Sequence, residues 1–246
     1  MEGSLLIFVV GIGPGHLEHM TLEAKAAIES CDVLVGYDVY VDLVKHLAPE
    51  KEVITTGMTR EVERCQLALS EALKGKTVAL VCSGDAGVYG MAGVMLEVAE
   101  PHPEVEIHII AGVTAASSSA ARLGAPLTHD FAVISLSDLL TPWEKIEKRL
   151  LLASEADFVI CLYNPRSKKR MEHLNSAVHL IGIHRAKDTP CGYVRNAGRE
   201  DEFSEICTLS ELADKDIDMF TTIIIGNSKS KTINGRLVTP RGYKGI

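Results

Sequence analysis

Several features that would direct a protein to other roles are missing from this chain of 246 residues. Its six cysteines never show the Cys-x-x-Cys spacing of zinc or iron–sulfur sites; they are Cys31, Cys65, Cys82, Cys161, Cys191 and Cys207. No apolar run approaches the roughly 18 residues that span a membrane, and the N-terminus shows no signal peptide. We therefore expect reduced core cysteines, no metal site, no membrane association and a cytoplasmic location.

Positive charge is also in short supply. The chain has 25 Lys and Arg against 33 Asp and Glu, a net charge of −8. Phosphate contacts need a basic face, so this balance counts against a general nucleic-acid binder and leaves open a local basic pocket for a small anion. Apolar residues, in contrast, make up 46 % of the chain, which is enough for a sizeable core.

The pattern of apolar runs predicts an α/β protein of two α/β domains, residues 1–113 and 114–246. In the first domain, strands expected over 5–10, 33–35, 77–82 and 105–110 alternate with helices over 21–30, 40–47, 61–73 and 88–98. This alternation is typical of a mainly parallel sheet covered by helices. In the second domain, helices are expected over 114–123 and 168–181, with strands over 131–136, 158–162, 191–195, 202–207 and 221–225. Strands this close together indicate a mixed sheet.

A glycine-rich loop, Gly11-Ile12-Gly13-Pro14-Gly15, follows the first buried strand. The carboxyl edge of an open α/β sheet is where ligands bind. As a dinucleotide fingerprint the loop is poor, because His16 replaces the third glycine and Pro14 lacks a backbone donor. The second strand also ends without the acid that would hold a ribose. A simple tight turn is the alternative.

Four more loops follow strands in the same way. The second, residues 82–90, contains Asp85, which could cap the next helix or face a cationic ligand. The third, residues 111–116, consists mostly of small residues that suit either a bound ligand or close helix packing. The fourth, residues 162–170, gathers four cations at a predicted helix start, which favours an anion site over a solvated face. The fifth, residues 194–202, mixes donors with carboxylates or is a polar turn.

Taken together, these motifs resemble the tetrapyrrole methylases, a family of S-adenosylmethionine-dependent methyltransferases. The resemblance covers nearly the whole chain. Three segments, residues 36–40, 84–92 and 163–167, resemble the branch that methylates carbon 17 of precorrin-3B or cobalt-factor III and contracts the ring in corrin (cobalamin) biosynthesis. The resemblance implies two α/β domains with the cofactor in the cleft between them, and a homodimer. It leaves open whether the substrate carries cobalt.

The resemblance also implies site residues. Those expected to bind S-adenosylmethionine, whose product is S-adenosylhomocysteine, are Pro14, Ser83, Gly84, Asp85, Val88, Thr114, Ala115, Asn164 and Ala197. Because the implied tetrapyrrole carries many carboxylates, we expect cationic clamps among Arg60, Arg122, Arg166, Lys168, Arg195 and Arg199. Ring contraction needs proton movement, for which the candidates are Tyr37, Asp85, Tyr89 and His129.

Three other functions remain open at this point. A different methylase of the same fold would act on uroporphyrinogen III or another corrin carbon. A nicotinamide-dependent oxidoreductase would share the glycine-rich first loop. A non-catalytic carrier would bind the macrocycle without a methyl donor.

Overall fold

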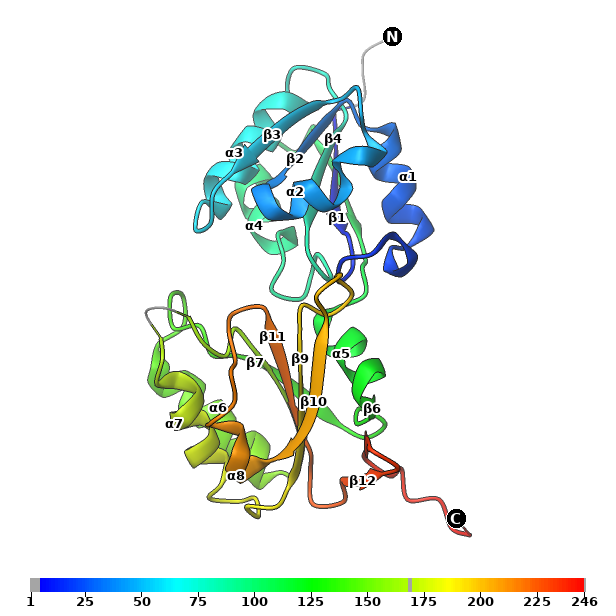
Figure 1. The fold of residues 1–246 in the computed structure, drawn as a ribbon. Coiled ribbons are helices and arrows are strands. Elements are labelled where there is room, and N and C mark those ends of the chain that lie inside the picture. The colour runs from blue at the N-terminus through cyan, green and yellow to red at the C-terminus, as the bar shows by residue number, and fades with distance from the viewer. Residues whose placement is uncertain (1–4, 168–169, 246) are drawn as a thin grey trace. The chain divides into compact units, whose positions relative to one another are not determined.

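The computed structural model describes residues 5–167 and 170–245. The chain divides into an N-terminal unit, Met1–Ala115, and a C-terminal unit, Ala116–Ile246 (Figure 1). The division falls two residues beyond the expected boundary at residue 113.

The N-terminal unit is built on a parallel five-stranded sheet in the order β3-β2-β4-β1-β5. Its strands are β1 (Leu6–Gly11), β2 (Val33–Tyr37), β3 (Glu52–Thr56), β4 (Val78–Cys82) and β5 (Glu106–Ile110). Its helices are η1 (Leu17–His19), α1 (Leu22–Ser30), α2 (Asp38–Val44), η2 (Lys45–Leu47), α3 (Glu61–Ala72) and α4 (Ala92–Ala99). Every residue of β4 is buried, as expected of a central strand, whereas the edge strand β3 is largely exposed.

The helices of this unit cover both faces of the sheet. After β1 the chain forms α1, whose Ala24, Ala27 and Ile28 pack on one face. After the neighbouring strand β4 it forms α4, whose buried residues pack on the other face with those of α3. Adjacent parallel strands whose connections leave to opposite faces create a crevice at their carboxyl ends, and this is the usual ligand site of such sheets.

The C-terminal unit contains a mixed five-stranded sheet in the order β10-β9-β11-β8-β7 and a small sheet in the order β12-β13-β6. Strand β7 is parallel to β8, and the other pairs in the larger sheet are antiparallel. The strands are β6 (Gly124–Ala125), β7 (Phe131–Ser135), β8 (Val159–Tyr163), β9 (Pro190–Arg195), β10 (Phe203–Thr208), β11 (Thr221–Ile225), β12 (Lys231–Ile233) and β13 (Arg236–Val238). The helices are α5 (Ala115–Leu123, which begins at the last residue of the N-terminal unit), α6 (Trp143–Glu155), α7 (His173–Ile181) and α8 (Leu209–Leu212).

The predicted fold class is confirmed: the first sheet is parallel and the second is mixed. The expected helix over 88–98 is wrong at its start, because α4 begins only at Ala92. The helix expected over 168–181 begins at His173. Strand β3 and helix α6 were not predicted. Within the described residues, no helix is long and apolar enough to cross a membrane.

Candidate functional site

Two glycine-rich loops of the N-terminal unit are joined directly by their backbones. The Gly13 N–H donates to the Gly84 carbonyl at 3.0 Å, and the Gly84 N–H donates to the Gly13 carbonyl at 2.8 Å. One residue earlier, the Ile12 N–H donates to the Cys82 carbonyl at 2.9 Å. The loops after β1 and β4 therefore form one ordered structure at the crevice where these strands end.

Asp85 ties the third loop to this pair. Its carboxylate accepts the Gly87 N–H at 2.8 Å with one oxygen and the Gly112 N–H at 2.9 Å with the other. The expectation that Asp85 caps the next helix is wrong, since α4 begins after Met91, with no side-chain cap. Asp85 instead binds the Gly87 backbone within its own loop and holds the loop after β5 beside it.

Glycine is required where these loops meet. A Cβ atom on Gly112 would lie 2.1 Å from the Gly84 carbonyl oxygen and 2.5 Å from that of Gly11. Both obstacles are backbone atoms, so no side-chain rotation relieves the clash. The three loops thus approach one another as closely as bare backbone permits, which places several peptide groups around one point.

Most of the expected cofactor residues of the N-terminal unit lie on these loops. Pro14 is buried just beyond the Gly13–Gly84 bridge, and Ser83 and Thr114 are half-buried. Val88 and Tyr89 are 36 % and 59 % exposed, and Tyr89 has a φ of 54° in the left-handed region. The remaining two are Gly84, in the bridge, and Ala115, at the start of α5.

Arg64 is a charged residue at this edge that the sequence analysis missed. It is 4 % exposed, and its guanidinium donates to Thr56 Oγ1 at 2.8 Å and to the Gly57 carbonyl at 2.9 Å. It also lies 5.9 Å from the ring centroid of Tyr37, at the end of β2. Among the described residues, no carboxylate lies within 4.0 Å of it. Nothing in the sequence indicated its burial, because an arginine inside a predicted helix is normally exposed.

The C-terminal unit also brings loops together at one edge of its sheet. Strand β11 is antiparallel to both β8 and β9, so those two strands run in the same direction and end at the same edge. Asn164 follows β8, has a φ of 52°, and donates from Nδ2 to Ser135 Oγ at 3.0 Å. The Tyr163 hydroxyl accepts the Ala116 N–H at 2.6 Å, which fixes the start of α5 there.

The turn that contains Ala197 follows β9 and is held by carboxylates. The Gly198 N–H donates to Glu202 Oε2 at 2.6 Å, and Glu202 Oε1 lies 2.8 Å from Arg122 Nε. Asn196 donates from Nδ2 to Asp201 at 2.7 Å. Asn196 and Gly198 both have positive φ, so these bonds fix a turn that leaves the Ala197 backbone in a defined position.

His129 lies at the opposite edge of this sheet. It precedes β7, which is parallel to β8, and the paired residues Phe131 and Val159 are both at the starts of their strands. Asn164 follows the end of β8, on the far side of the sheet. The expectation that His129 faces the same edge as the other candidates is therefore wrong, because strand direction was not known from the sequence.

The Arg and Lys residues expected to bind the substrate differ in their contacts with the rest of the protein. Arg60 forms a two-pronged ion pair with Glu63 on α3, Arg122 pairs with Glu202 and Arg195 lies 3.3 Å from Asp216. Arg166 donates to the carbonyls of Lys215 and Ala213 and to Asn175, so it joins the loop after β8 to the α8 region. Arg199 lies 5.6 Å from the Phe220 ring. Lys168 lies outside the described residues.

The described residues contain no group of three or more His, Cys, Asp or Glu side chains that could hold a metal ion. The site therefore consists of backbone groups, glycines and a few braced polar side chains.

This fold and these loops define a class of methyltransferases. The structure superimposes on a solved one, "Crystal structure of the methyltransferase CobJ", with a TM-score of 0.90 and 34 % identity, covering 96 % of this chain and 99 % of that one. The profile of the Tetrapyrrole (Corrin/Porphyrin) Methylases matches residues 6–213, and the chain belongs to this family. The family uses S-adenosylmethionine, and the nicotinamide alternative is thereby overturned.

Two relatives match over almost their full lengths. A Salmonella typhimurium protein named "Probable cobalt-factor III C(17)-methyltransferase" is 49 % identical, covering 97 % of this chain and 99 % of that protein. A Sinorhizobium protein named "Precorrin-3B C(17)-methyltransferase" is 41 % identical, covering 100 % of this chain and 99 % of that protein.

Proposed function

We propose that this chain transfers a methyl group from S-adenosylmethionine to carbon 17 of cobalt-factor III or precorrin-3B, with ring contraction, in cobalamin biosynthesis. The observation that carries the proposal is the meeting of three backbone loops at the crevice of the first sheet. The sequence similarity of the chain to two relatives named for this activity supports the choice of substrate.

The chemistry of the methyl donor suits this site. S-adenosylmethionine supplies an activated methyl group on a sulfonium, together with a carboxylate, an ammonium and an adenine, and it carries no phosphate. Backbone amides and carbonyls can recognise these groups. Pro14 in the first loop has no backbone N–H, but this is no disadvantage, because the ligand has no phosphate to bind. The residues proposed to hold it here are Pro14, Ser83, Gly84, Val88, Thr114 and Ala115.

Asp85 is proposed as a positioning residue for the same site, because both of its oxygens already accept backbone N–H groups. In the C-terminal unit, Asn164 and the Ala197 backbone are proposed as further cofactor contacts. Their turns have positive φ and are fixed by side-chain hydrogen bonds. Such preorganised groups lower the cost of binding, since little must be ordered when the ligand arrives.

Methyl transfer to carbon is an in-line displacement, so the protein mainly aligns the reactants and excludes water. Ring contraction also needs proton transfer, for which Tyr37 and Tyr89 remain the candidates. The Tyr37 ring centroid lies 5.9 Å from the buried Arg64 guanidinium, at the end of β2. Substrate carboxylates are proposed to meet Arg195, the last residue of β9, and Arg199, in the turn that follows it. Four further residues stay candidates: Arg60, Arg122, Arg166 and Lys168.

Two further expectations belong to this proposal. The protein is proposed to act as a homodimer, as the family resemblance implies. It is proposed to work in the reducing cytoplasm, because all six of its cysteines are free and buried.

A calorimetric titration with S-adenosylhomocysteine tests the donor site. Wild type should bind one equivalent, and Gly84→Arg should not, because Gly84 has a φ of +69° and its Cβ direction faces Ala115 and Thr114. Equal affinity of the two proteins would remove the second loop from the site. Turnover of cobalt-factor III, precorrin-3B and uroporphyrinogen III, measured separately, tests the acceptor. Methylation of uroporphyrinogen III alone would favour the other methylases of this fold.

A further inference from the structure

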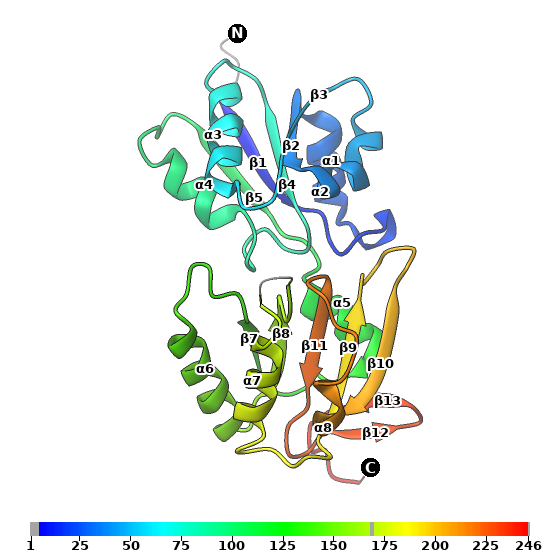
Figure 2. The same cartoon turned by 60° about the vertical axis from the view of Figure 1, so that its left-hand side comes forward.

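The loop between β7 and α6 presents two large apolar side chains to solvent. Leu139 is 70 % exposed and Leu140 is 97 % exposed, and we refer to this pair as the leucine tip. Met171, in the segment between β8 and α7, is 56 % exposed. Figure 2 shows the loop between β7 and α6 at the end of the C-terminal unit where β7 finishes. Two consecutive exposed leucines do not stabilise the isolated chain, because exposing apolar surface to water is unfavourable.

The leucine tip stands on an anchored loop. Asp138, the residue before it, lies 3.1 Å from His173 Nε2 and 4.0 Å from Arg170 Nε. The contact with His173, more than the weaker influence of Arg170, keeps the pKa of Asp138 below its ordinary value, so the carboxylate stays charged. The His173 ring packs against Trp143, with ring centroids 4.4 Å apart. At the other end, the Ser137 N–H donates to Ser135 Oγ at 3.2 Å.

These contacts join the two loops into one surface. Asp138 and Trp143 flank the leucine tip on the β7–α6 side, while Arg170 and His173 flank Met171 on the β8–α7 side. The same edge carries Asn164, a proposed cofactor contact, which is hydrogen-bonded to Ser135 at the end of β7. The exposed apolar side chains are therefore presented in fixed positions beside the proposed site.

Arg170 indicates which kind of ligand this surface binds. Its Nη1 is buried and has no hydrogen-bond partner within residues 5–167 and 170–245. A buried guanidinium nitrogen without an acceptor is costly, and a carboxylate is the group that best satisfies it. A flat apolar ring bordered by carboxylates would cover the leucine tip and meet Arg170 at once.

We infer that Leu139, Leu140 and Met171, with Arg170 beside them, form the surface that seats the macrocycle substrate. This inference rests on the proposed function and assigns the acceptor site to these two loops. The leucine tip contacts the apolar ring, and Arg170 contacts a carboxylate at its border. Asp138 and His173 act as positioning residues that hold the two loops together.

The test compares steady-state methylation of cobalt-factor III by wild type and by the double variant Leu139→Ser, Leu140→Ser. Because both side chains are exposed, the variant should fold normally. Its KM for the macrocycle should rise about tenfold to a hundredfold, the loss expected when two leucines no longer bury apolar surface. Its affinity for S-adenosylhomocysteine should stay within about twofold, since neither leucine is a proposed donor contact. The matched control is Ile183→Ser, 58 % exposed just beyond the other end of α7, which should leave both values unchanged.

The variant Arg170→Met is a second, independent test. It should raise the KM for the macrocycle and leave S-adenosylhomocysteine binding intact, whereas Arg149→Met, an exposed change on α6, should do neither. An unchanged KM in the double variant would overturn the inference. So would a double variant that changes only the sedimentation behaviour, since the leucine tip would then cover a second copy. Failure of wild type to methylate any macrocycle would instead refute the proposed function.

Discussion

At the scale of single residues, the proposed donor site depends on glycines, which have no Cβ atom, as much as on residues with side chains. Gly11 and Gly112 let three loops meet backbone to backbone, and Asp85 supplies the acceptors that close the arrangement. No catalytic nucleophile is needed there, because the methyl group arrives already activated on a sulfonium. The chemistry therefore depends on precise backbone placement.

Substituting Gly112 by alanine tests this placement. The added Cβ would lie 2.1 Å from a backbone oxygen, so the loops must move apart, and the Gly112 N–H would leave Asp85. We expect S-adenosylhomocysteine affinity to fall at least a hundredfold, or roughly 3 kcal/mol, measured by calorimetry. Gly93→Ala is the control, because a Cβ there meets nothing within 4 Å and helix α4 should tolerate or prefer it. Normal binding by Gly112→Ala would contradict the described meeting of the loops.

A second prediction at this scale concerns pH. Lys215 first, and Tyr193 second, hold the pKa of Glu205 below its ordinary value of 4.5. Because the folded pKa is lower than the unfolded one, the pair stabilises the protein above about pH 4.5, and this contribution is lost as the pH falls through the folded pKa. Glu205→Gln should therefore lower Tm near neutral pH and flatten its fall on acidification.

Thermal melts from about pH 7 to about pH 3 measure this effect. Glu200→Gln, an exposed change in the neighbouring turn, is the control and should keep the slope of wild type. A Glu205→Gln melt that follows the wild-type curve across the whole range would contradict the stabilising role of this carboxylate.

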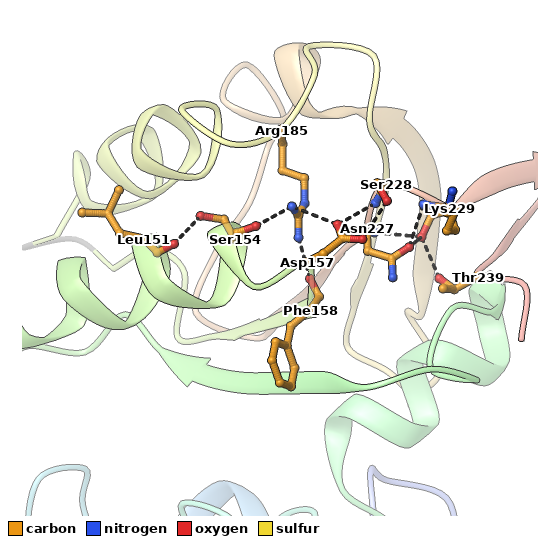
Figure 3. A network of polar contacts seen from close by, with 10 residues as sticks. Leu151, Ser154, Asp157, Phe158, Arg185, Asn227, Ser228, Lys229 and Thr239 are labelled. Carbon is orange, nitrogen blue, oxygen red and sulfur yellow. Dashed lines mark hydrogen bonds and ion pairs between the residues drawn. The ribbon is translucent and has the colours of Figure 1, made fainter.

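At the scale of elements, the C-terminal unit has a brace at the edge of its sheet away from Asn164 and Ala197. Arg185 is 8 % exposed and donates to the carbonyls of Ser154 and Phe158, which end α6 and precede β8. It also lies 3.0 Å from Asp157, whose carboxylate accepts the N–H and the hydroxyl of Ser228 (Figure 3). Burial raises the pKa of Asp157, but the bonds from Ser228 and the charge of Arg185 outweigh it and leave a lowered value.

Removing this brace should destabilise the unit without touching the proposed site. Arg185→Met leaves two backbone carbonyls and a carboxylate without their donor, at a cost of about 3 kcal/mol in the free energy of unfolding. Chemical denaturation followed by circular dichroism measures this loss, with Arg149→Met as a neutral control. At a temperature where the variant is folded, S-adenosylhomocysteine should bind as in wild type. A weakened affinity there would contradict the separation of brace and site.

The same scale explains what could be predicted from the sequence. The strands expected over 77–82 and 221–225 are confirmed as β4 and β11, and every residue of both is buried. The edge strand β3 was not predicted, since most of it is exposed. The start of α4 was placed too early, because the apolar residues over 88–91 continue the helical pattern although the chain bends there.

The candidate site was predictable in its parts and not in its assembly. The glycine-rich loops were visible as motifs. The structure joins the first two by backbone hydrogen bonds and ties the third to them through the Asp85 carboxylate. His129 failed because its position depends on the direction of β7, which periodicity does not reveal. Arg64 was missed because its burial depends on contacts with Thr56, Gly57 and Tyr37, which come from other elements and leave no pattern in the helix. Contacts between distant segments, rather than local propensity, decided both cases.

At the scale of the whole molecule, all six cysteines are free and buried, in both units. Burial raises the pKa of Cys65 and Cys161 to about 12, and that of Cys82 and Cys207 to about 11. Thiols react as thiolates, so the folded protein should react slowly with a disulfide reagent at neutral pH, and denaturant should release six rapid equivalents. Rapid reaction of several cysteines in the folded protein would contradict their burial.

The central claim is that these loops serve methyl transfer to one carbon of a corrin precursor. The most direct measurement supplies the purified chain with S-adenosylmethionine labelled in its methyl group and with cobalt-factor III, and locates the label in the isolated product by nuclear magnetic resonance. We predict one labelled methyl group, on carbon 17 of a ring-contracted macrocycle. Label at another carbon, or a folded protein that binds the donor and transfers nothing, would contradict the claim.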